Sequence, residues 1–262
     1  MTTSGPRAEH RFWEAVGASF PSLKGAASTR YYLACEQALF AAFVPELQGL
    51  RIFKTDLWDE AKNTEILRWV AEQGARPVGA DLSLEIVREA RRVLAAHRPG
   101  LAQADIRTLP LRTGSVDLVY SMGTIEHFPE HAAATREIAR VLRPGGRAII
   151  GVPNRRDPFL RPLLVRLLQG LGLYAYGAER SFTRRQLARL VEAAGLRVAA
   201  ESGILFMPGG LRMLDLLWHT RGWPGSRLVG GLVRPFAWLY DRVPALRRHG
   251  YLIVCIADKP GG

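Results

Sequence analysis

Two aspartates follow short predicted strands, where a carboxylate can bind a sugar or a base. Asp81 ends the apolar segment 77–80 and precedes a helix that Ser83 can cap. A carboxylate at such a position can accept hydrogen bonds from both hydroxyls of a ribose. Asp105 follows the predicted strand 101–104 and can accept from an adenine amino group, while Ile106 packs on the ring face. We therefore expect an adenosine-containing ligand here; a helix cap and a surface-loop acid are the alternatives.

The loop after the first predicted strand, residues 50–55, contains no glycine. Side chains in this loop block the close backbone approach that a pyrophosphate requires, and Asp56, Asp59 and Glu60 would repel its charge. This argues against NAD, FAD and nucleoside triphosphates. The same carboxylates could accept from an ammonium group, and the Thr55 hydroxyl could bind either a donor or an acceptor. A divergent structural turn is the alternative interpretation.

His127 is the best candidate for a general base. It follows the fourth predicted strand, 116–121, and the unperturbed pKa of histidine suits proton transfer near neutral pH. A histidine that orients the loop or packs under the next helix is the alternative. The neighbouring Glu126 is a second candidate, although that carboxylate could instead accept from the backbone. Tyr31 and Tyr32, in the N-terminal helical region, could cover a ligand or contact an acceptor, or they could simply pack.

Strand and helix signals alternate from residue 50 onward, which is typical of βαβ units. The pattern predicts a Rossmann-like, doubly wound α/β fold with a mainly parallel seven-stranded sheet. The pattern of residues 1–49 predicts an N-terminal helical lid, and that of residues 50–262 predicts a single domain. Two helical cap insertions are expected, at about 157–172 and 206–249. The predicted strands lie at residues 50–55, 77–80, 101–104, 116–121, 147–152, 197–203 and 251–257.

Three stretches appear in a familiar order: Val-Gly-Ala-Asp-Leu-Ser at 78–83, Val-Asp-Leu-Val-Tyr-Ser-Met-Gly-Thr-Ile-Glu-His-Phe at 116–128 and Val-Leu-Arg-Pro-Gly-Gly at 141–146. Together they resemble the class I S-adenosylmethionine-dependent methyltransferases of the small-molecule type, over residues 50–203 and 250–259. The resemblance implies S-adenosylmethionine as the cofactor, with ribose bound by the second-strand acid and the adenine amine by the third-strand acid. It implies a cofactor site made of Thr55, Asp56, Asp81, Leu82, Asp105, Ile106, Ser121 and Met122.

The chain departs from this family in the first loop, which usually reads acid-x-Gly-x-Gly-x-Gly. Lys54 stands in the place of that acid, and Asp56, Trp58 and Glu60 stand in the glycine places. The loop resembles a minor subgroup with Lys-Thr-Asp-Leu-aromatic-acid-Glu. The departure affects the expected contacts with the methionine end of the cofactor and leaves the two strand-end acids in place.

Composition limits the possible metal sites, cellular location and membrane contacts of this protein. The chain has 262 residues, a net charge of +12 and 48% hydrophobic residues, and its basic residues are almost all arginine. Cys35 and Cys255 lack metal-ligand or CxxC spacing, so no metal is expected. The N-terminus has no signal-peptide core and no apolar run could span a bilayer, which favours the cytoplasm. Residues 206–249 interleave leucine and tryptophan with arginine, which suits either a membrane interface or an ordinary cap.

We therefore predict methyl transfer from S-adenosylmethionine to a small, apolar or lipid-like acceptor. A nicotinamide oxidoreductase would need GxGxxG after the first strand and Tyr-x-x-x-Lys, and both are absent. An RNA methyltransferase is favoured by charge alone, so nucleic acid is not the expected partner. A non-catalytic binding module with a degenerate methyltransferase fold is the remaining alternative, and the lost glycines support it. Oligomeric state and the methylated atom stay open.

Overall fold

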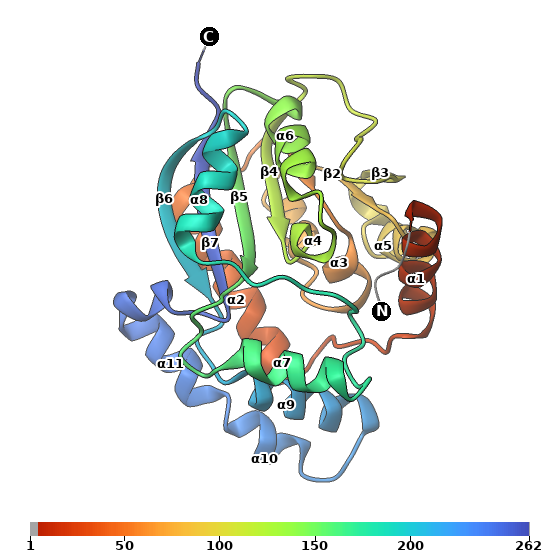
Figure 1. Cartoon of the computed structure of the whole chain (residues 1–262), viewed down its shortest axis with the longest axis vertical. Helices are drawn as coiled ribbons and strands as arrows, with labels where there is room; N and C mark the ends of the chain where they lie inside the picture. The colour runs from red at the N-terminus through yellow and green to blue at the C-terminus, as the bar shows by residue number, and fades with distance from the viewer. Residues whose placement is uncertain (1–4, 262) are drawn as a thin grey trace.

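The computed structural model describes residues 5–261, and a seven-stranded sheet forms its centre (Figure 1). The strands are β1 (Arg51–Lys54), β2 (Arg76–Asp81), β3 (Gly100–Gln103), β4 (Val116–Met122), β5 (Leu142–Pro153), β6 (Arg197–Ile204) and β7 (Leu252–Asp258). Their order is β3-β2-β1-β4-β5-β7-β6, and only β7 runs antiparallel to its neighbours. The chain builds outward from β1 to β3 and returns to β4 beside β1, so a crevice is expected at the carboxyl ends of β1 and β4. The predicted doubly wound, mainly parallel fold is confirmed.

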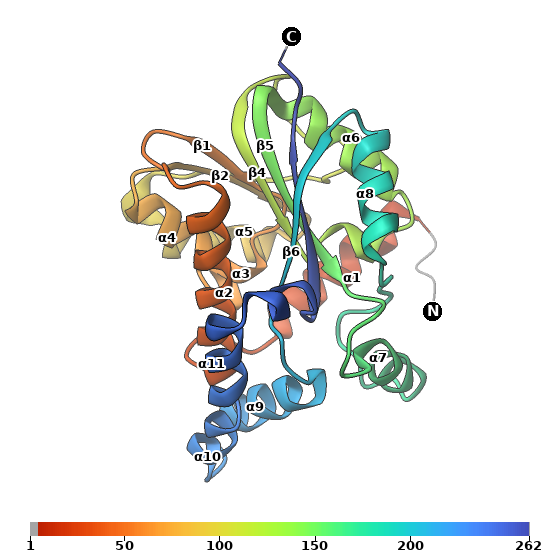
Figure 2. The same ribbon diagram turned by 90° about the vertical axis from the view of Figure 1, so that its left-hand side faces the viewer.

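Helices cover both faces of the sheet (Figure 2). One face carries α2 (Ala27–Phe43), α3 (Trp58–Lys62), α4 (Ile66–Glu72) and α5 (Leu84–Val93), and the other carries α6 (His131–Val141) and α8 (Arg184–Ala193). Each face has its own cluster of buried apolar side chains. The near-continuous burial of β4 and β5 follows from this double covering.

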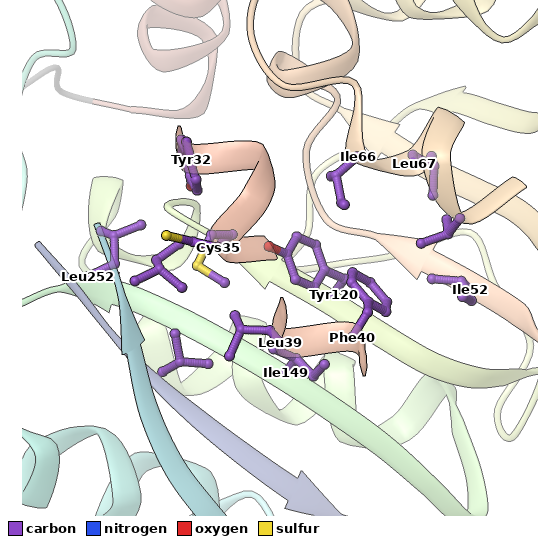
Figure 3. Packing of buried hydrophobic residues seen from close by; sticks show 14 of the residues in the cluster. Tyr32, Cys35, Leu39, Phe40, Ile52, Ile66, Leu67, Tyr120, Ile149 and Leu252 are labelled. Atoms are coloured by element: carbon purple, nitrogen blue, oxygen red, sulfur yellow. The ribbon is translucent and has the colours of Figure 1, made fainter. Parts of the chain in front are cut away.

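The helix α2 belongs to the core of the sheet as well as to the N-terminal region. Tyr32, Cys35, Leu39 and Phe40 form the apolar stripe expected from the sequence and are buried. Figure 3 shows Leu39 and Phe40 lying against Tyr120 of β4 and Ile149 of β5. The other N-terminal helix, α1 (Pro6–Ser19), packs near α5 instead. The division into a lid at 1–49 and a domain at 50–262 stays a prediction, and α2 contributes to the core of that domain.

Several element boundaries differ from those predicted. Two short helices, α3 and α4, follow β1, and the helix α5 ends at Val93 before the short 3-10 helix η1 (Ala95–His97). Strand β5 begins at Leu142, which pairs with Val116, rather than at Arg147. The Arg-Pro-Gly-Gly turn is therefore absorbed into an irregular start of the strand, where the register between β4 and β5 shifts.

The two insertions gather at one end of the molecule, opposite the C-terminus (Figures 1 and 2). The first contains α7 (Arg161–Gly170). The second contains α9 (Gly209–Arg221), α10 (Ser226–Gly231), α11 (Arg234–Arg242) and the 3-10 helix η3 (Pro244–Arg248). No helix among residues 5–261 is both long enough and apolar enough to cross a bilayer.

Candidate functional site

A cavity of about 240 Å³ lies where the sequence predicts the site. Nine of the eleven predicted site residues line it: Thr55, Asp56, Asp81, Leu82, Asp105, Ile106, Met122, Glu126 and His127. They come from four segments that follow β1, β2, β3 and β4, because the carboxyl ends of parallel strands meet at one edge of the sheet. Side chains from α1, α7 and α9 close the remaining walls.

The glycine-free loop is organised around a buried lysine. The Lys54 side chain is fully buried, and its Nζ lies 3.0 Å from Asp56 Oδ1, 2.9 Å from Asp59 Oδ2 and 3.5 Å from Glu60 Oε2. These carboxylates hold the pKa of Lys54 well above its usual value, even though burial alone would lower it. Burial raises the pKa of Glu60 to about 7, and nearby Lys54 opposes that rise. One cation therefore neutralises part of the acidic loop.

Side-chain hydroxyls connect this loop to the end of β4. The Thr55 hydroxyl donates to Ser121 Oγ at 2.9 Å, and it also lies 3.0 Å from Thr124 Oγ1. The Thr124 hydroxyl donates to Asp56 Oδ2 at 2.6 Å. Each contact here depends on a polar side chain, and the arrangement fixes Asp56 at the cavity wall.

Asp81 holds the same loop from the side of β2. Its Oδ2 accepts from the Leu57 amide at 2.9 Å, and its Oδ1 accepts from the Ser83 amide at 2.8 Å. Burial raises the pKa of Asp81 to about 7, although both amide hydrogen bonds favour the carboxylate. Since an ionised carboxylate has about four acceptor positions, two remain for a ligand. The predicted ribose acid is thus also a structural anchor of the loop.

Asp105 already has a cationic partner within the protein. The Arg107 guanidinium donates to both of its carboxylate oxygens, with Nε 2.9 Å from each and Nη2 2.6 Å from Oδ2. Arg107 also pairs with Glu9 of α1 and Glu130, at 2.9 Å each. Hydrogen bonding to Arg107 outweighs burial and lowers the pKa of Asp105. The sequence did not predict this pairing, which occupies the oxygens expected to meet an adenine amine.

His127 and Glu126 lie side by side at the cavity. Nδ1 of His127 is 3.1 Å from the Ala178 carbonyl oxygen, which can only accept, so the Nδ1–H tautomer leaves Nε2 with its lone pair. Burial lowers the pKa of His127, which favours the neutral ring. Glu126 Oε1 lies 4.0 Å from Nε2. Burial and the nearby Glu179 raise the pKa of Glu126 well above its usual range, and its Oε2 has no hydrogen-bond partner in the described chain.

Two predicted site residues lie away from the cavity wall. Tyr31 is buried in the core, where its ring packs edge-on against Tyr240 and its hydroxyl is 3.4 Å from the Phe236 carbonyl. The neighbouring Tyr32 lines the cavity, so the helical phase of α2 turns Tyr31 away. Ser121 is fully buried and acts through the Thr55 hydroxyl. Tyr31 and Ser121 therefore pack and hold neighbouring side chains in this structure, and their direct roles at a ligand stay predictions.

The far wall of the cavity comes from residues that the sequence did not single out. Arg161 of α7 is buried, pairs with Glu179 at 2.9 Å and stacks on the Tyr251 ring at 4.1 Å. Tyr174 also donates to Glu179. Apolar and aromatic side chains complete this wall: Trp13, Trp58, Tyr176, Leu205, Met213, Leu216 and Leu252. They come from segments distant in sequence, so no local pattern could have predicted their convergence.

Known methyltransferases match the part of this chain that contains the strand-end acids. Residues 46–150 match the family model described as a methyltransferase domain. This segment is a methyltransferase domain of the class I S-adenosylmethionine-dependent type. A relative from Mycolicibacterium smegmatis, named "probable S-adenosylmethionine-dependent methyltransferase", is 31% identical over 56% of this chain and 52% of its own length. The ubiquinone biosynthesis O-methyltransferase of Aeromonas salmonicida is 33% identical over 35% of this chain and 40% of that protein.

Solved structures extend the likeness of this methyltransferase-family chain to its whole fold. The protein in complex with the Haloferax volcanii Trm112 methyltransferase activator superposes with a TM-score of 0.65 at 18% identity, over 98% of this chain and 99% of that one. In sequence, the matches span about half the length of the curated relatives or less. The segment that matches the family model runs from before β1 into β5, and the insertions α7 and α9–α11 lie outside it.

Proposed function

We propose that the protein transfers a methyl group from S-adenosylmethionine to a small, apolar or lipid-like acceptor. The observation that carries this proposal is the convergence of Asp81, Asp56 and His127 on one cavity at the carboxyl ends of β1, β2 and β4. When bound, S-adenosylmethionine supplies a methyl group on a cationic sulfonium, and most of the protein's task is to orient the acceptor toward it.

The residues around the cavity fit the two polar ends of such a cofactor. Asp81 keeps two acceptor positions for ribose hydroxyls after binding its two backbone amides. Asp56 and Asp59 line the cavity and share the single Lys54 cation, so the loop keeps excess negative charge. That charge favours an ammonium and a sulfonium over a pyrophosphate. The glycine-free loop thus supports a cationic cofactor.

His127 would receive the acceptor proton where the reaction releases one. Its Nε2 is unprotonated because Nδ1 faces the Ala178 carbonyl and burial lowers the ring's pKa. Burial and the nearby Glu179 raise the pKa of Glu126, which favours its protonated form, so His127 is the preferred base. The Trp13 ring packs against the imidazole in a T-shaped arrangement, with centroids 4.9 Å apart, and helps to hold the histidine in place.

The shape and polarity of the far wall support the acceptor class. Tryptophan, tyrosine and leucine side chains dominate it, which suits an aromatic or alkyl body. Arg212 also lines the cavity, is buried, and has no carboxylate within 4.0 Å in the described chain. A buried guanidinium without such a partner favours a ligand that carries an anionic group. The relatives named ubiquinone biosynthesis O-methyltransferase and tocopherol O-methyltransferase support an acceptor with an apolar body.

Isothermal titration calorimetry with S-adenosylmethionine and S-adenosylhomocysteine tests the proposal. The folded wild type should bind both, and Asp81→Ala should abolish or greatly weaken binding. Asp241→Asn, an exposed position on α11 outside the cavity, is the charge-matched control and should bind as the wild type does. Release of S-adenosylhomocysteine with an alkylcatechol or a long-chain fatty acid would then test the acceptor class. A folded wild type that binds neither cofactor form would support the non-catalytic binding module instead.

A further inference from the structure

The strongly exposed large hydrophobic side chains of residues 5–261 all lie between Leu160 and Val243, within or beside the two insertions. On α7 they follow the helical repeat: Leu160, Leu163, Leu167 and Leu171 are each at least 60% exposed. Spacings of three and four residues place them on one side of the helix. The opposite side carries the buried Arg161 and Val165. The helix α7 therefore turns Arg161 and Val165 toward the protein, whereas its leucine side has no partner among residues 5–261.

The second insertion continues this apolar surface. Leu228 of α10 is 80% exposed, and Leu232 and Trp238 are more than half exposed. The helix α9 packs against both α7 and α10, so the two insertions form one unit. Figures 1 and 2 show α7, α9, α10 and α11 together at the end of the molecule that lies opposite the C-terminus.

The charge of the protein is concentrated in the same part of the chain. The two insertions, residues 157–172 and 206–249, contain nine arginines, no lysine and three acids, which is +6 of the net +12. Within the described chain, only Arg161 among these arginines forms an ion pair with a carboxylate. Arg166, Arg227 and Arg234 are exposed beside the leucines of α7, α10 and α11. Exposed guanidinium groups without internal partners are complementary to an anionic surface.

We propose that the exposed faces of α7 and α9–α11 dock this protein onto an anionic phospholipid bilayer. Leucine and tryptophan would enter the interfacial region while arginine meets the headgroups. This surface lies on the membrane without crossing it, since no described helix could span one. The proposal extends the expected contact through 206–249 to α7. A second copy of this chain fits less well, because its own arginine-bearing surface would repel this one.

Docking would place one wall of the cavity at the lipid surface. Arg161 of α7 and Met213 and Leu216 of α9 line the cavity, while the outer sides of the same helices carry exposed leucines. An acceptor dissolved in the bilayer would then reach the cavity between these helices. This step rests on the proposed methyl transfer, whereas the docking itself does not.

Vesicle co-sedimentation tests the docking surface. The wild type should bind phosphatidylcholine vesicles that contain about 30% phosphatidylglycerol, should bind pure phosphatidylcholine weakly, and should be released by salt. The double variant Leu163→Glu/Leu167→Glu should bind at least about tenfold more weakly, because it removes two exposed leucines and adds two negative charges. Arg136→Glu changes the net charge equally on the exposed side of α6, and it should retain most of the binding.

Calorimetry with S-adenosylhomocysteine on the same proteins separates docking from methyl transfer. Leu163 and Leu167 do not line the cavity, so the double variant should bind this compound as the wild type does. The proposal is overturned if the wild type does not bind the phosphatidylglycerol vesicles at low salt, or if the double variant binds them equally well. It is also overturned if the wild type self-associates in analytical ultracentrifugation, binds no vesicles and becomes monomeric in the double variant.

Discussion

Asp81→Asn should weaken both the fold and the binding of the cofactor, because Asp81 anchors the glycine-free loop and is the proposed ribose ligand. Its two oxygens accept the amides of Leu57 and Ser83 at 2.9 and 2.8 Å. Asparagine has one carbonyl oxygen, so its NH2 group must face one of these N–H donors. A buried amide left without an acceptor costs about 1–3 kcal/mol, and we expect the free energy of unfolding to fall by about that amount. Urea denaturation followed by circular dichroism measures this loss.

The pH dependence gives a second measurement of the same group. The folded protein raises the pKa of Asp81 from 3.8 to about 7, so folding favours the protonated acid. The stabilisation from this group is therefore complete below about pH 4 and is lost as the pH rises through about 7. Because asparagine does not titrate, the stability gap between wild type and Asp81→Asn should narrow between about pH 5 and pH 8.

Cofactor affinity should change in the opposite direction. Ribose hydroxyls donate most strongly to the ionised carboxylate, so wild-type affinity for S-adenosylhomocysteine should rise about tenfold from about pH 6 to about pH 8. Asp81→Asn should bind at least about tenfold more weakly at the higher pH and show no such rise. Unchanged stability of the variant at both pH values would refute the link to Leu57 and Ser83. The same pH dependence of affinity in both proteins would refute the ribose role.

Further substitutions test the buried ion pairs beside the cavity and the candidate base. Lys54→Met should lower the free energy of unfolding by about 3–5 kcal/mol, because it leaves the buried carboxylates of Asp59 and Glu60 without their cation. This loss should shrink in acid as the two carboxylates protonate. Urea denaturation at two pH values measures both effects. Glu179→Gln should cost a similar amount by leaving Arg161 uncompensated, and Arg161→Met/Glu179→Leu should recover most of the loss in the same assay. His127→Gln should lower kcat about 10²–10⁴-fold for an acceptor that releases a proton, with affinity for S-adenosylhomocysteine unchanged; an unaltered kcat would assign the proton to another group.

The parts of the structure that the sequence predicted depend on local pattern. Strand β2 and the helix after it follow from an apolar run, an acid and the Ser83 cap, whose side chain does accept from the Ile86 amide. Parallel strands then bring Asp81 and Asp105 to one edge without any knowledge of distant contacts. The same reasoning could not decide whether the apolar stripe of α2 covers the site or the sheet, because both require the same spacing.

The unpredicted parts depend on contacts between distant segments. Glu9 and Arg107 are 98 residues apart, and their pairing, together with Asp105, requires α1 to lie across the end of β3. Arg161 belongs to the first insertion, whose helix α7 packs on α9, and its partner Glu179 lies in the segment that follows α7. Residue type indicates that such groups can pair, and only the tertiary structure shows which of them do.

Side-chain contacts hold the glycine-free loop in its conformation. The buried Lys54 ammonium pairs with the carboxylates of Asp56, Asp59 and Glu60, and the Leu57 amide donates to Asp81 at the end of β2. A change at any of these groups should therefore affect the ribose position together with the loop. Loss of the glycines removes the close backbone approach that a phosphate needs, while the excess of carboxylates over Lys54 provides the negative potential that a sulfonium and an ammonium need. The departure that first counted against a nucleotide cofactor is thus the feature that best fits a cationic one.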